Sequence, residues 1–183
     1  SIACALEGFE LKLDPYAVPL MLPDFTEVAQ REVVKGLVLM AINAQTLSKA
    51  YSAFRGGEKT GSKAKKLKNL QLQALLEAVI KRVPVLEKYI GRDKGVELMR
   101  IDGEITSQII NHFTSKKIPV LSVHDSYIIA ADKDHELTEA MDKAASRVVG
   151  KKVNLETEGF GYGSLRAMTN LDGTDQLTKL TRL

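Results

Sequence analysis

The 183-residue sequence lacks several features that would assign it to a class of protein at once. It holds a single cysteine, Cys4, so it can form no internal disulfide and no Cys-x-x-Cys pair for zinc or redox chemistry. Its longest apolar run, residues 33–42, is interrupted by Lys35 and Gly36 and is far shorter than the ~20 residues that cross a bilayer. The first residues of the given sequence do not show the basic-then-apolar pattern expected of a signal peptide. These absences indicate a reducing, cytoplasmic setting and no membrane partner.

Charge of one sign is also scarce, because 26 Lys and Arg residues face 23 Asp and Glu residues, a net charge of +3. This balance is too small to imply nucleic-acid binding by itself. Hydrophobic residues make up 44% of the chain and charged residues 27%, which is enough for a buried core and excludes a disordered chain. The length predicts one compact domain, or one with a small satellite. No glycine-rich phosphate cradle of the P-loop or dinucleotide type is present.

Apolar periodicity predicts a mostly helical α/β (α+β) chain. Helices are expected over residues 1–8, 27–54, 70–81, 102–114 and 135–149, with the third continuing to residue 89 after an interruption at Pro84. Expected N-caps are Asp24 or Thr26 for the second helix and Asp132 or Asp134 for the last, and Gly8 and Gly150 are expected C-caps. A strand is expected over residues 152–157, and residues 55–69, rich in Gly and Lys, are expected to form a mobile loop.

The most informative stretch is residues 118–130, where two short β-branched runs flank His124 and Asp125. This pattern predicts a β-hairpin with the polar pair at its tip. A carboxylate at such a tip suits a Mg²⁺ site, in which the ion takes one or two carboxylates plus substrate phosphates. It also suits an ordinary exposed turn. A His-Asp-Ser hydrolase relay is excluded, because adjacent residues of an extended chain point to opposite faces.

Basic residues form two further candidate sites. Arg31 and Lys35 lie four apart on a predicted helix, where they could clamp a triphosphate or form an ordinary solvated pair. The loop lysines could follow a phosphate backbone or only solubilise the loop. The three histidines, His112, His124 and His135, have no metal-binding spacing. The candidate nucleic-acid lysines are Lys59, Lys63, Lys65, Lys66 and Lys68.

In this order, the pieces resemble the palm-and-fingers core shared by family A DNA polymerases and the single-subunit RNA polymerases of phages and mitochondria. Residues 120–126, Val-Leu-Ser-Val-His-Asp-Ser, are similar to motif C, and their His-Asp-Ser form is that of the RNA polymerases. Arg31-x-x-x-Lys35 resembles the start of motif B, the fingers helix that holds the incoming triphosphate. Asp102-Gly-Glu, before the hairpin, resembles a segment that approaches template or primer. The resemblance covers residues 1–141.

The resemblance implies roles for individual residues. Asp125 would bind Mg²⁺ (or Mn²⁺), and His124 would orient either the primer end or the adjacent carboxylate; both are candidate catalytic residues. Asn43 would line the nucleotide pocket beside the triphosphate clamp, and Asp102 and Ser126 would contact nucleic acid together with the lysines. Motif B normally ends in Tyr-Gly, and Asn43 and Ala44 stand at those positions.

Motif A, which supplies the family's second metal-binding Asp, has no match in the sequence. Residues 1–26 resemble the segment that follows it, so the chain is expected to be a fragment whose partner carboxylate lies upstream. Residues 27–99 would be fingers-like, 100–158 palm-like and 159–183 a C-terminal tail. A phage or mobile-element origin fits this resemblance.

The expected function is therefore template-directed transfer of a nucleotide from a nucleoside triphosphate to a 3′-hydroxyl. Two metal ions perform this chemistry in the family, so a chain with one carboxylate is expected to be weak or inactive alone. Two alternatives remain: a non-catalytic nucleic-acid-binding module of the same shape, which Asn43 favours, and a helical structural or oligomerisation domain.

Overall fold

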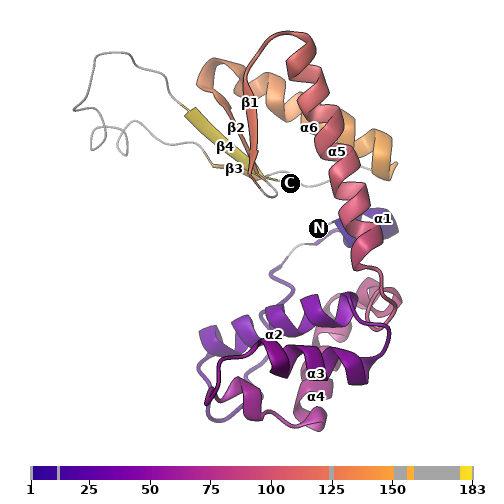
Figure 1. Ribbon diagram of the computed structural model, residues 1–183, viewed down its shortest axis with the longest axis vertical. Coiled ribbons are helices and arrows are strands. Elements are labelled where there is room, and N and C mark those ends of the chain that lie inside the picture. The colour runs from indigo at the N-terminus through magenta and orange to yellow at the C-terminus, as the bar shows by residue number, and fades with distance from the viewer. Residues whose placement is uncertain (1, 12, 124–125, 151–155, 159–177, 183) are drawn as a thin grey trace, which may run out of the picture. The chain divides into compact units, whose positions relative to one another are not determined.

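A computed structural model describes residues 2–11, 13–123, 126–150, 156–158 and 178–182. Within these ranges the chain is mostly helical, with six α-helices and an antiparallel hairpin (Figure 1). This confirms the predicted fold class at that level. The chain divides into two compact units: Glu7–Met99, here the helical unit, and Ser1–Leu6 with Arg100–Leu183, here the hairpin unit.

The helical unit contains α2 (Glu27–Ile42), α3 (Leu47–Gly57) and α4 (Asn69–Arg82), joined by the 3-10 turns η1 (Ala64–Lys66) and η2 (Pro84–Lys88). Helix α2 contacts both α3 and α4. Phe54 of α3 lies against Gly36 of α2, where a Cβ would be only 3.6 Å from its ring. The fully buried side chains of this unit include Val34, Leu37, Leu72, Leu75 and Val79, and they form its core.

The single helix predicted over residues 27–54 is wrong, because the structure has two helices there. Asn43 caps the C-terminus of α2, and Thr46 begins α3 by accepting a hydrogen bond from the Lys49 N–H at 3.3 Å. Apolar periodicity resumes in α3, so the periodicity of the sequence does not reveal the break between the two helices. At the start of α2 the cap is Thr26, one of the two predicted residues, whose Oγ1 accepts from Ala29 N–H at 3.2 Å.

Residues 55–69 also differ from the prediction, since they are not a loop without regular structure. Helix α3 continues to Gly57, and η1 buries Ala64 and leads to the buried Leu67. The Ser62 hydroxyl accepts from Lys65 N–H at 3.2 Å and closes the turn. Two buried apolar residues, Ala64 and Leu67, among many lysines are too few to produce a recognisable apolar pattern in the sequence.

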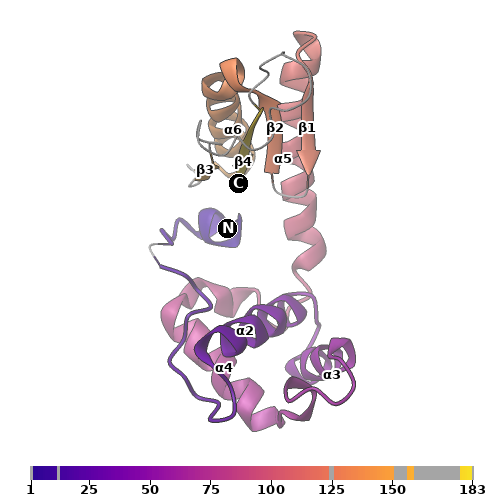
Figure 2. The same cartoon turned by 90° about the vertical axis from the view of Figure 1, so that its left-hand side faces the viewer.

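The hairpin unit contains α1 (Ile2–Glu7), α6 (Asp134–Val149), the strands β1 (Val120–Val123) and β2 (Ser126–Ala130), and most of α5 (Gly95–Ser115). Beyond the hairpin, β4 (Thr178–Arg182) pairs with β2, and β3 (Glu156–Glu158) pairs with β4, all antiparallel, in the order β1-β2-β4-β3. Helices α5 and α6 pack on one side of the sheet (Figure 2). The core between them contains Ile105, Ile109, Phe113, Tyr127, Ile129, Leu137 and Met141.

Element ends in this unit follow local rules in part. Gly150 ends α6 with φ 75°, and Gly8 follows α1 with φ 67°, as predicted for both glycines. The predicted Asp caps of α6 are wrong: Lys133 is the N-cap, because the 3-10 turn η3 (Ala131–Lys133) runs directly into the helix. Helix α5 begins at Gly95, seven residues before the predicted start. The prediction started too late because Val96 and Met99, in the first turns of the helix, are exposed and do not extend its buried apolar stripe.

Among the described residues, no helix combines the length and apolarity needed to span a membrane.

Candidate functional site

The predicted hairpin is present, and its register limits the turn to two residues. Val123 pairs with Ser126, so His124 and Asp125 alone separate the paired ends. Both lie outside the described residues, and the catalytic and metal-binding roles assigned to them stay predictions. Ser126, a predicted nucleic-acid contact, begins β2 and is 5% exposed. Access to its side chain is therefore small.

Helix α2 presents Arg31 and Lys35 one turn apart, and Lys35 is exposed. Arg31 is paired with two carboxylates: its Nε donates to Asp14 Oδ2 at 2.5 Å and its Nη1 to Glu32 Oε1 at 2.9 Å. Its guanidinium also lies over the Tyr16 ring, 5.9 Å from the centroid. Arg31, which was predicted to bind a triphosphate, is thus already bound by side chains of the chain itself.

The Asp14 carboxylate is held from more than one direction. Its Oδ1 accepts from the Tyr16 N–H at 2.9 Å, and the Asp14 backbone carbonyl accepts from Arg82 Nε at 2.8 Å. Burial raises the pKa of Asp14, but the hydrogen bonds from Arg31 and Tyr16 outweigh it, so the pKa is lowered overall. The bond to Asp14 in turn raises the pKa of Arg31. Sequence reasoning missed Asp14, whose only signal was the Asp-Pro-Tyr turn.

Asn43, the predicted nucleotide-pocket residue, caps α2. Its Nδ2 donates to the Leu39 carbonyl at 2.8 Å. The side chain also lies against the backbone of Gly95, where a Cβ would be 1.7 Å from Asn43 Oδ1. Asn43 therefore has a structural task at the end of α2, and only glycine fits beside it without displacing its amide.

The five candidate lysines differ in their surroundings. Lys65 is half-buried, and its Nζ donates to the Glu58 carbonyl at 3.1 Å. Lys63 is exposed, and its Nζ donates to the Asp24 carbonyl at 3.0 Å. The exposed lysines for which the structure gives no side-chain partner among the described residues are Lys59, Lys66 and Lys68. These three are the best placed to contact a ligand.

Asp102 lies on α5 and influences a buried tyrosine of the hairpin. Burial raises the pKa of Tyr127, the Thr106 hydroxyl opposes that shift, and the Asp102 charge adds to it. The Tyr127 and Thr106 oxygens are 2.7 Å apart, which ties β2 to α5. This polar contact fixes the hairpin on the helix, and nothing in the sequence pattern singled it out.

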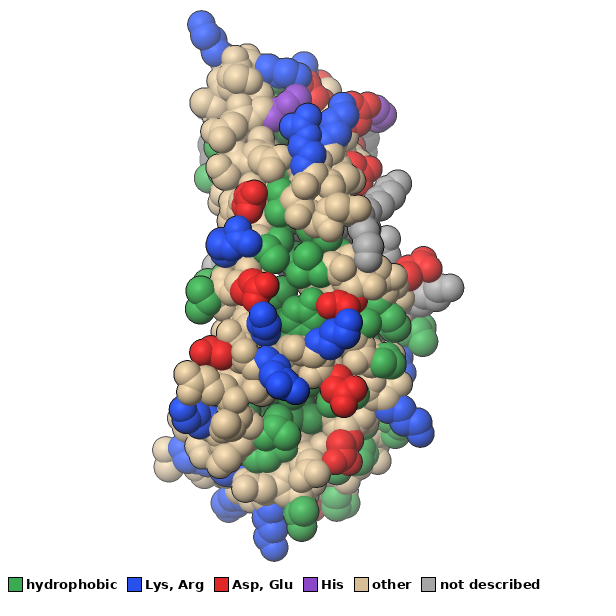
Figure 3. Space-filling view, turned by 90° about the vertical axis from the view of Figure 1, so that its right-hand side faces the viewer, with side chains coloured by type: hydrophobic (Ala, Val, Ile, Leu, Met, Phe, Trp, Pro, Cys, Tyr) green, Lys and Arg blue, Asp and Glu red, His purple; other side chains and the backbone are tan. Residues whose placement is uncertain are grey.

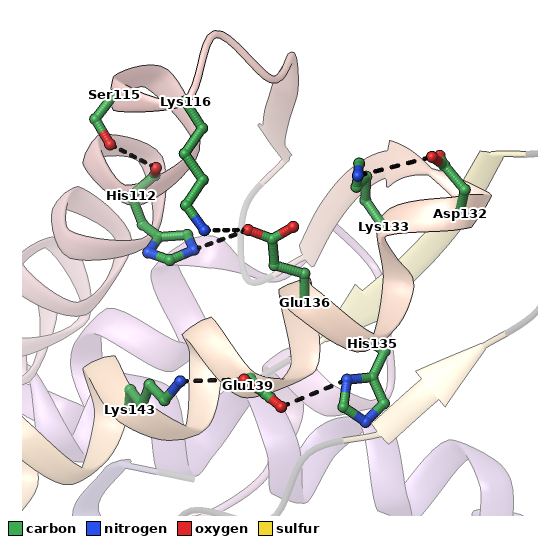
Figure 4. Close-up of polar contacts among 9 residues, drawn as sticks. All are labelled: His112, Ser115, Lys116, Asp132, Lys133, His135, Glu136, Glu139 and Lys143. Carbon is green, nitrogen blue, oxygen red and sulfur yellow. Dashed lines mark hydrogen bonds and ion pairs between the residues drawn. The ribbon is translucent and has the colours of Figure 1, made fainter.

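A mixed-charge cluster, missed by sequence reasoning, joins the end of α5 to the start of α6 (Figure 4). Glu136 of α6 accepts from Lys116 and lies 3.3 Å from His112 Nε2, while Glu139 bonds Lys143 at 3.1 Å. The hydrogen bond from Lys116 lowers the pKa of Glu136. An open cavity of about 300 Å³ is lined by His112, Lys116, Glu136, Glu139, Ala140 and Lys143.

The cluster is electrically balanced, because each carboxylate has its own lysine. More widely, basic and acidic side chains lie beside one another over much of the face drawn in Figure 3. Within the described ranges, no group of three or more His, Cys, Asp or Glu side chains is placed to hold a metal ion.

Comparisons with protein-family models, with curated proteins and with solved structures found no match to this chain.

Proposed function

We propose that this chain is part of a template-directed nucleotidyltransferase with a palm-and-fingers core. It would transfer a nucleotide from a nucleoside triphosphate to a 3′-hydroxyl, and Ser126 favours RNA over DNA as the product. In this proposal the hairpin unit is palm-like and the helical unit is fingers-like.

The observation that carries the proposal is the β1–β2 hairpin with its two-residue connection. Strand pairing from Val120↔Ile129 to Val123↔Ser126 leaves His124-Asp125 as the whole connection. On the inner face Tyr127 and Ile129 are buried against α5 and α6, which gives the hairpin a rigid base. Asp125 stands between these two strands in the sequence, and its carboxylate is the proposed ligand of the cation.

The helical unit supports the nucleotide half of the proposal. Arg31 and Lys35 project from neighbouring turns of α2, a spacing at which both can reach one polyphosphate. Lys59, Lys66 and Lys68 are exposed for a nucleic-acid backbone.

Asp125 is the residue that would hold Mg²⁺ or Mn²⁺. The ion would supply charge neutralisation at the phosphates. His124 would orient the primer end beside it.

The proposal is tested with the full chain, Mn²⁺ and a primed DNA template. We expect Mn²⁺ binding, followed by electron paramagnetic resonance, that is lost in Asp125→Ala. Asp132→Ala is the matched control, because this exposed Asp lies close after β2 and its described ion pair is a loose one with Lys133, at 3.9 Å. Nucleotide incorporation by the chain alone is expected to be weak or absent.

Other outcomes select the alternatives. Salt-dependent binding of the primed template without Asp125-dependent Mn²⁺ binding would indicate a non-catalytic nucleic-acid module. Absence of both would indicate a structural domain.

A further inference from the structure

The Arg31 guanidinium has two edges, Nε with Nη2 and Nη1 with Nη2, and either edge can donate two hydrogen bonds to one phosphate. On each edge, one nitrogen already donates to a carboxylate. Asp14 takes Nε on one edge, and Glu32 takes Nη1 on the other. A phosphate that binds Arg31 through two parallel hydrogen bonds therefore has to displace a carboxylate.

The two carboxylates are not held equally. The Glu32 side chain is 60% exposed and lies next to Arg31 in sequence, and among the described residues its polar contact is the Arg31 guanidinium. The Asp14 side chain is 34% exposed and is fixed by the Tyr16 N–H, while Arg82 holds its backbone carbonyl. Glu32 can leave by a side-chain rotation, whereas release of Asp14 also breaks the turn at Tyr16.

We propose that Asp14 is an internal competitor of the polyphosphate ligand at Arg31. The proposal rests on the proposed function, since it takes the Arg31–Lys35 face of α2 as the polyphosphate site. Asp14 Oδ2 occupies the Nε edge of Arg31, and the ligand takes that edge only after the residue 14–16 turn has released it, whereas the Nη1 edge becomes available when Glu32 rotates away. Lys35, whose ammonium is exposed and outside this contact, binds the polyphosphate without that step.

Inorganic triphosphate, titrated calorimetrically into the full chain, tests the competition. In Asp14→Asn we expect about fivefold tighter binding, the effect of removing one half-exposed ion pair. Glu32→Gln is the matched control, because it removes the same charge from the same guanidinium but from a mobile side chain; we expect less than a twofold change. In Asp14→Asn/Arg31→Ala, the gain from the Asn substitution should disappear.

Unchanged or weaker triphosphate binding by folded Asp14→Asn would overturn the proposal, and so would an equal gain in Glu32→Gln. Neither result touches the Asp125-dependent Mn²⁺ binding on which the proposed function is tested, so the two can fail separately.

A measurement on the unsubstituted chain covers the case in which Asp14→Asn does not fold. In ¹³C NMR titrations, saturating triphosphate should raise the pKa of the Asp14 carboxyl toward the ordinary Asp value, because the Arg31 hydrogen bond is lost. A pKa of Asp14 that does not move when triphosphate is bound contradicts the competition.

Discussion

In each of the two units a non-helical segment is attached to helices, but polar side chains form most of the attachment in one unit and apolar side chains form it in the other. In the helical unit, the irregular segment of residues 13–25 is attached largely by polar side chains, above all by Gln30. This glutamine is 2% exposed and bonds the N–H groups of Met21 and Leu22 and the carbonyl of Pro19. In the hairpin unit, the strands are attached by an apolar core and by the polar Tyr127–Thr106 contact.

The difference teaches where each unit is vulnerable. A buried polar anchor fails as a whole when one group is removed, because its partners are left unsatisfied. An apolar core loses stability in proportion to the volume removed. Polar contacts on the outside of the hairpin unit, such as Lys116–Glu136, contribute least, because water screens them.

The largest expected effect is that of Gln30→Ala. It leaves two N–H groups and one carbonyl of the 13–25 segment without partners, and we expect a loss of about 2–3 kcal/mol of stability. Hydrogen exchange followed by mass spectrometry reports each unit separately, and the loss should be confined to Glu7–Met99. Gln73→Ala is the control, since the described hydrogen bond of this exposed glutamine is to Glu77 on its own helix. Similar losses of stability in Gln30→Ala and Gln73→Ala would contradict the view that buried polar contacts of Gln30 hold the 13–25 segment in the helical unit.

An intermediate effect is expected at Gly95. A Cβ there meets the Asn43 amide, which must rotate away from the Leu39 carbonyl, so Gly95→Ala should cost about 1 kcal/mol, one hydrogen bond. Gly103→Ala lies in the same helix with nothing within 4 Å of the new methyl group, and should gain about 0.5–1 kcal/mol from the helix preference of Ala. Urea denaturation of both variants measures the two opposite signs. A stabilising Gly95→Ala would show that Asn43 is not a tight neighbour.

The smallest effect is a pH dependence at Glu136. Because the Lys116 hydrogen bond lowers the pKa of this carboxyl in the folded chain, the pair stabilises the fold above the ordinary Glu pKa of about 4.3 and is lost as the pH falls below it. Thermal melting of Glu136→Gln between pH 3 and 6 should show a weaker acid dependence than the unsubstituted chain. Glu104→Gln, which removes an exposed pair with Arg100, controls for general charge effects. Identical acid dependence in Glu136→Gln and the parent would contradict the prediction.

Short stretches of sequence correctly predicted those features of the fold that depend on neighbouring residues alone. Thr26, Gly8 and Gly150 are caps that a short stretch of sequence determines, and the alternation around His124-Asp125 predicted the hairpin. Gln30 could have been noticed as a polar residue on the apolar stripe of α2, one turn before Val33 and Val34. The backbone groups that it bonds could not, since they belong to a segment without periodicity.

The sequence by itself determined a mostly helical chain with one central hairpin and two cations on one helix face, because periodicity and turn chemistry act over a few residues. Only the tertiary structure decided that Arg31 is engaged by Asp14, that Asn43 is pressed against Gly95, and that Glu136 joins α5 to α6. These contacts join residues 17, 52 and 20 positions apart in the chain. No local pattern encodes them, since they form only when packing brings distant segments together.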